Sequence, residues 1–146
     1  MFGIAAKRMG AKAAMISTRV RPSVRSHHAA SITRINTDDP RMSKAVVHNG
    51  IVYLSGLIDA SGADVTAQTK NVLKEVDGLL EKAGTSKSNI LSASIWLKDI
   101  DKDFKAMNEV WIDWLDPEHK PVRATVQSPM ALPQLLVEIQ VTAAVE

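Results

Sequence analysis

Alternating apolar and polar residues predict two β-strands near the C-terminus, within residues 122–126 and 137–141. The link between them contains two prolines, which favour a loop. Each strand carries one charged residue, Arg123 on the first and Glu138 on the second. Each charge alternates with aliphatic residues, so we expect its side chain to point to the opposite face of its strand from these.

Similar patterns predict strands nearer the N-terminus. Residues 31–36 form a short candidate strand that ends at a turn-forming cluster. Residues 45–47 and 51–54 flank an Asn-Gly pair, which accepts positive φ at both positions and predicts a hairpin. Residues 90–98 alternate apolar and polar side chains and predict a further strand.

Helical periodicity predicts two helices. Apolar residues recur every three or four positions from Asp64 to a C-capping Gly84, with Gln68 expected on the polar face. A second apolar stripe follows Asp101, the expected N-cap, and ends before Pro117. The methionine and tryptophans of this stripe have core spacing.

The predicted order is ββαβαββ, in a single domain over residues 31–146. A helix between strands implies a crossover, so we expect an α+β fold with a mixed sheet and both helices on one face. No sequence remains to cover the other sheet face. We therefore expect a homo-oligomer, with ligand sites in the clefts between subunits.

Basic residues are concentrated at the N-terminus. Seven of the 18 lysines and arginines lie in residues 1–37, which contain no acid, so residues 38–146 carry 11 basic and 16 acidic residues, a net charge of −5. This charge disfavours nucleic-acid binding. Residues 1–30 have the composition of a transit peptide and predict mitochondrial localisation, the alternative being a tail of no consequence on a cytoplasmic protein. Their apolar runs are too short to span a membrane.

Motifs for most cofactor-dependent chemistry are absent from the sequence. It contains no glycine-rich phosphate loop, no HExxH, no GxSxG and no cysteine. The four histidines are not spaced as metal ligands, and a surface role is expected for them. We therefore expect neither a cofactor nor a metal.

Arg123 and Glu138 are the remaining candidates for chemistry. A guanidinium can hold a substrate carboxylate through two charge-assisted hydrogen bonds, and a carboxylate can orient and deprotonate a water. The alternative is a structural salt bridge between adjacent strands.

Five segments together resemble the RidA/YjgF family of reactive-intermediate deaminases: HNGIVYLSG, AQTKNVLKEVDGLLEKAG, ILSASIWLKDIDKDFKAMNEVWIDWL, PVRATV and LVEIQVTAAV. The resemblance covers residues 32–145. It implies a chorismate-mutase-like subunit and a homotrimer with three intersubunit clefts. It also implies cofactor-free hydrolysis of enamines and imines (2-iminoacids) to 2-oxo acids and ammonia.

The resemblance also implies roles for particular residues. Arg123 matches the arginine that binds the substrate carboxylate, and Glu138 matches the acid that holds the attacking water. Met42 stands where better-known members have a cleft tyrosine, and the loop at residues 57–64 looks shorter, which points to a side branch of the family. The remaining cleft positions carried over are Ser55, Gly56, Asn108 and Thr125.

Other functions are weighed against the deaminase. A trimeric protein that binds 2-oxo acids or other small carboxylates without turnover would need only Arg123, with Glu138 as its structural partner. Chorismate mutase is weaker because a dianionic substrate calls for more than one cation. Ribonuclease activity finds no support in an acidic domain.

Overall fold

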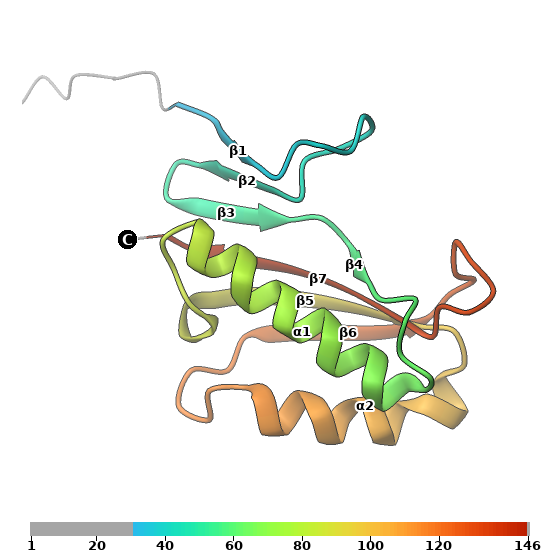
Figure 1. Cartoon of the computed structure of the whole chain (residues 1–146). Helices are drawn as coiled ribbons and strands as arrows, with labels where there is room; N and C mark the ends of the chain where they lie inside the picture. The colour runs from blue at the N-terminus through green and yellow to red at the C-terminus, as the bar shows by residue number, and fades with distance from the viewer. Residues whose placement is uncertain (1–30, 146) are drawn as a thin grey trace, which may run out of the picture.

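The computed structural model describes residues 31–145, so the leader predicted over residues 1–30 lies outside the described part. The expected α+β architecture is confirmed, with two helices on one face of a mixed sheet (Figure 1). The elements are β1 (Thr33–Ile35), β2 (Ala45–His48), β3 (Ile51–Leu54), β4 (Leu57–Ile58), α1 (Val65–Lys82), a 3₁₀ turn (Lys87–Asn89), β5 (Ile90–Leu97), α2 (Ile100–Trp114), β6 (Val122–Gln127) and β7 (Val137–Ala144).

The structure has two short strands, β1 and β4, that the predicted order ββαβαββ does not count. β1 confirms the candidate strand within residues 31–36. β4 lies in the segment predicted as a loop, where two residues pair with β7. Two residues are too few to show an alternating pattern, so this strand could not be predicted from periodicity.

The sheet runs in the order β1-β2-β3-β7-β5-β6, with β4 beside β7. Within residues 31–145 the only parallel pair is β5 with β6, and the crossover that parallel strands require is α2. Because β5 lies between β6 and β7, the strands that carry Arg123 and Glu138 are not neighbours. The prediction that they lie on adjacent strands is therefore wrong.

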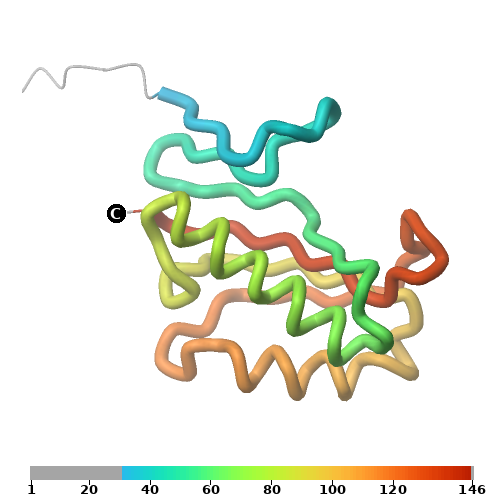
Figure 2. Tube along the Cα trace, in the orientation of Figure 1, coloured from blue at the N-terminus to red at the C-terminus, as the bar shows by residue number. Residues whose placement is uncertain are grey.

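The core lies between the sheet and the two helices, which cover the same face (Figure 2). Ile95 of β5 and Ile139 of β7 are paired and fully buried under the helix layer. In β5 the odd-numbered residues from 93 to 97 face this core, and the even-numbered residues face the other side of the sheet. A residue of β6 or β7 that pairs with β5 points to the same face of the sheet as its partner, so this alternation also shows which face each of those residues occupies.

Local signals explain where several elements begin and end. Asn49 and Gly50 both have positive φ, 51° and 72°, as the predicted hairpin requires. Gly84, at φ +81°, follows α1 in the left-handed conformation that ends many helices. The N-cap of α2 is Asp99, whose carboxylate accepts a hydrogen bond from the Lys102 amide, and not Asp101 as predicted.

Gln68 is only 1% exposed, which corrects its placement on the polar face of α1. Its amide donates hydrogen bonds to the carbonyls of Gly62 (3.1 Å) and Gln134 (2.9 Å). Its side-chain oxygen accepts the Leu136 amide at 2.9 Å. These bonds satisfy a buried amide and fix the chain just before β7, the strand that carries Glu138.

The sheet face opposite the helices has no covering layer within residues 31–145 (Figure 1). Val122 and Val126 of β6 lie on it, since they pair with Ser92 and Trp96, and Val122 is 73% exposed. Tyr53 and Ile58 add further exposed apolar surface. An apolar surface of this kind is typical of a protein interface. Among the described helices none is long and apolar enough to cross a membrane.

Candidate functional site

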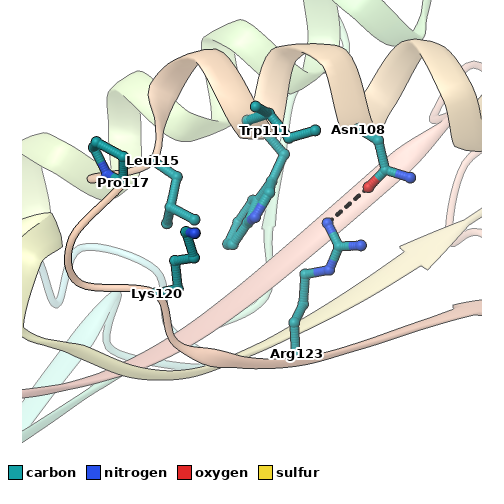
Figure 3. Close-up of a pocket in the computed structure, with 7 residues that line it drawn as sticks. Asn108, Trp111, Leu115, Pro117, Lys120 and Arg123 are labelled. Carbon is teal, nitrogen blue, oxygen red and sulfur yellow. Dashed lines mark hydrogen bonds between the residues drawn. The ribbon is translucent and has the colours of Figure 1, made fainter.

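Arg123 opens into a pocket between β6 and α2, here called the Arg123 pocket. Its volume is about 640 Å³. Asn108 and Trp111 reach it from α2, and Figure 3 shows the guanidinium of Arg123 directed towards both. The residues that line it are Asn108, Trp111, Ile112, Leu115, Pro117, Lys120 and Arg123.

Two contacts hold the guanidinium in place. Its Nη1 donates a hydrogen bond to Asn108 Oδ1 at 2.8 Å, and its central carbon lies 5.4 Å from the centre of the Trp111 ring. Partial burial lowers the pKa of Arg123, yet an arginine remains cationic at neutral pH. The bond to Asn108 uses only one of three guanidinium nitrogens. The others are available to a carboxylate.

Glu138 opens into a second pocket of about 440 Å³, here called the Glu138 pocket. The loop between β1 and β2 and the loop between β6 and β7 flank it, and both project at the same end of the molecule (Figure 2). The residues that line it are Asp39, Arg41, Met42, Lys44, Gly56, Ile58, Ala131 and Glu138.

Gly56 makes room for the carboxylate of Glu138. A Cβ atom built on Gly56 would lie 1.9 Å from Glu138 Oε1 and 2.9 Å from its Cδ, distances that no real pair of atoms adopts. The carboxylate therefore packs directly over the Gly56 backbone. This position requires glycine because a side chain would collide with Glu138, and not because its φ is unusual.

Arg123 and Glu138 lie on opposite faces of the sheet. Arg123 pairs with Ala93 and faces the helices, whereas Glu138 pairs with Trp96 and faces away from them. Neither forms an ion pair within residues 31–145, so the salt-bridge alternative is wrong. Within a single chain the two residues open into separate pockets. Arg123 and Glu138 face opposite sides because the aliphatic residues of β6 face away from the core, while those of β7 face into it.

The other candidate residues divide between the two sides. Thr125 lies beside Arg123 on the helix side, and its buried Oγ1 has no hydrogen-bond partner. Ser55 precedes Gly56 and likewise has a buried Oγ without a partner. Met42 lines the Glu138 pocket and is 40% exposed. The structure thus gathers Arg123, Asn108 and Thr125 in one group, and the rest near Glu138.

Sequence reasoning missed several pocket residues. Trp111 is in the core, as its spacing predicts, yet its ring also contacts Arg123. Lys120 lies in a short loop with no periodicity to mark it. Arg41 forms a 2.8 Å ion pair with Asp39, which raises the pKa of Arg41 and lowers the pKa of Asp39 to about 2.

No group of three or more acidic or histidine side chains within residues 31–145 is placed to hold a metal ion.

Comparison with known proteins places this chain in a family. The model of the family described as "Endoribonuclease L-PSP" matches residues 35–145. The crystal structure of NMB1025, a member of the YjgF protein family from Neisseria meningitidis, matches with a TM-score of 0.77 and 37% identity, over 80% of this chain and 96% of that one. The chain belongs to the RidA/YjgF family.

Other members of the RidA/YjgF family agree with this assignment. The RutC family protein YoaB of Escherichia coli (strain K12) is 44% identical over 115 residues, which cover 79% of this chain and 99% of YoaB. The crystal structure of Rv2704, a member of the YjgF/YER057c/UK114 family from Mycobacterium tuberculosis, matches with a TM-score of 0.73 and 27% identity, over 79% of this chain and 100% of that one. The family members therefore share the domain nearly from end to end.

Proposed function

We propose that this member of the RidA/YjgF family hydrolyses 2-iminoacids to 2-oxo acids and ammonia, without a cofactor, in clefts between the subunits of a homotrimer. The observation that carries the proposal is the separation of Arg123 from Glu138 by the sheet, with neither paired to an opposite charge. The Arg123 pocket lacks the carboxylate of Glu138, and the Glu138 pocket lacks the guanidinium of Arg123. A second copy of the chain that places its Glu138 pocket against the Arg123 pocket completes the site.

Two surface features support self-association. β6 is at the edge of the sheet, and an edge strand offers unpaired backbone groups. Its residues Val122 and Val126 are exposed on the face that no helix covers. Burial of such surface contributes about 25 cal/mol per Å² of apolar area. Both features lie next to Arg123, so an interface formed there would border the Arg123 pocket.

In the proposed mechanism, the guanidinium of Arg123 holds the substrate carboxylate through two hydrogen bonds, and Asn108 keeps the guanidinium in position. Glu138 of the partner subunit orients a water against the C=N carbon and accepts a proton as the water adds. That proton passes to the nitrogen of the resulting carbinolamine. As the C–N bond breaks, Glu138 takes the proton of the carbinolamine hydroxyl, which becomes the carbonyl of the 2-oxo acid, and ammonia leaves. The site contributes mainly orientation and a positioned base.

The description of the family model names an endoribonuclease, which is a different reaction. Residues 38–146 carry 11 basic and 16 acidic residues. A domain of that charge repels a phosphate backbone, so we favour a small carboxylate as substrate over RNA.

The test is release of ammonia and 2-oxo acid from a 2-iminoacid generated in situ. We expect Arg123→Ala to abolish both turnover and 2-oxo acid binding with the oligomer intact, and Glu138→Gln to lose turnover while retaining binding. Dissociation of the Arg123→Ala oligomer would instead make the arginine an interface residue. A rate no higher than the spontaneous one in the unmodified protein, with 2-oxo acid still bound, would favour a binding protein over an enzyme.

A further inference from the structure

The Arg123 pocket contains a second cation, Lys120, to which the proposed mechanism gives no role. Lys120 and Arg123 both line the pocket, and no acidic residue does. Among residues 31–145, the ion pairs involve neither cation. A substrate with one carboxylate neutralises Arg123, and no acidic residue of the same chain lines the pocket to neutralise Lys120.

The wall between the two cations is apolar. In the view of Figure 3, the Trp111 ring lies between the Arg123 guanidinium and the Lys120 side chain, which extends beside Leu115. The pocket of the single chain, about 640 Å³, is larger than a three- or four-carbon imino acid, although the partner's Glu138 occupies part of this space in the proposed site. Two cations on either side of apolar side chains suit a ligand with two anionic ends joined by methylene groups.

We propose that Lys120 determines substrate specificity, and that the preferred substrates are imines of acidic amino acids, which carry a second carboxylate on the side chain. This inference rests on the proposed function, because Arg123 binds the first carboxylate. Lys120 binds the second, and the methylene groups between them lie against Trp111 and Leu115. Lys120 does not take part in the chemical step.

The exposure of Lys120 limits the size of the preference. An exposed ammonium gains little from an ion pair because water and salt screen it, so the dicarboxylate is favoured by roughly two- to fivefold at low ionic strength. The preference falls as salt is added. The guanidinium of Arg123 is held by Asn108 and lies over the Trp111 ring, so binding through it is less sensitive to salt.

The test measures calorimetric binding of stable 2-oxo acids to the full chain. The probes are 2-oxoglutarate, 2-oxopentanoate of the same chain length, and 2-oxo-3-phenylpropanoate as an aromatic comparison. We expect 2-oxoglutarate to bind roughly two- to fivefold more tightly than 2-oxopentanoate, and Lys120→Gln to bring this ratio close to one. Lys105→Gln, an exposed lysine of α2 outside the pocket, is the matched control and keeps the ratio.

Several results would overturn the inference. Equal affinities for the two aliphatic acids, an unchanged ratio in Lys120→Gln, or tightest binding of the aromatic acid would each remove Lys120 as the determinant. Failure of the proposed function is distinguishable from these. If no 2-oxo acid binds, the role of Arg123 fails as well; if 2-oxo acids bind with the predicted ratio but no imine is hydrolysed, only the catalytic proposal fails.

Discussion

Substitution of Gly56 by alanine tests whether the position of the Glu138 carboxylate matters. The new Cβ would lie 1.9 Å from Glu138 Oε1, so the carboxylate must move, while Cγ, at 3.3 Å, shifts only slightly. The φ of Gly56 lies outside the left-handed region, so alanine strains no backbone there. The displaced group is the flexible end of a side chain, and an off-rotamer conformation costs about 0.5–1.5 kcal/mol.

The predicted effect on activity is much larger than the effect on stability. Misplacement of a catalytic group by about 1 Å lowers a rate by as much as roughly 100-fold. We therefore expect Gly56→Ala to release ammonia about 100 times more slowly, with the free energy of unfolding in urea lowered by no more than about 1.5 kcal/mol.

Gly78→Ala is the matched control for this substitution. No atom lies within 4 Å of a Cβ built on Gly78, which is inside α1. Alanine there should raise the free energy of unfolding by about 0.5–1 kcal/mol and leave the rate unchanged. A Gly56→Ala variant with full activity would refute the role of Glu138 placement, and one that fails to fold would make the contact structural.

Three further predictions concern stability and targeting. Gln68→Ala should lower the free energy of unfolding by about 2–4 kcal/mol, because it leaves a buried amide just before β7 unpaired. The control Lys70→Ala, at an exposed position of α1, should change it little, and equal effects of the two substitutions would contradict this. Hydrogen bonds from Ser88 and the Glu118 amide lower the pKa of Asp116 to about 2, below its ordinary 3.8, so its contribution to stability is present above pH 4 and is lost as pH falls towards 2. The melting temperature of Asp116→Asn should accordingly lie below that of the unmodified protein at pH 7 and converge with it near pH 2, and a constant difference would be inconsistent with this. Residues 1–30, fused to a fluorescent protein, should direct it to mitochondria, and a diffuse cytoplasmic signal would refute the transit-peptide interpretation.

Much of the fold could be predicted from periodicity and turn chemistry. The Asn49-Gly50 hairpin, the start of α1 directly after Asp64 and its end before Gly84 all agree with the prediction. Gln68 was misplaced because a polar residue within an amphipathic helix normally faces water. Only the tertiary structure brings the backbone of Gln134 and Leu136 to its side chain.

The site could be predicted as a set of residues but not as a geometry. Both charges alternate with aliphatic residues, and that pattern alone places each charge away from the core. For β7 this is correct, because Val137 and Ile139 are fully buried. For β6 it is wrong, because Val122 and Val126 face the uncovered side and Arg123 faces the helices. Alternation does not distinguish residues that face a core from residues that face another copy of the chain.

Division of the site between two copies is the central claim, and activity of mixed oligomers tests it most directly. Arg123→Ala and Glu138→Gln are each expected to be inactive alone. If one chain supplies Arg123 and the next supplies Glu138, equal amounts of the two variants assembled together restore about a quarter of full activity, since each partner is competent in half of the cases. No recovery in oligomers shown to contain both variants would contradict a site shared between subunits.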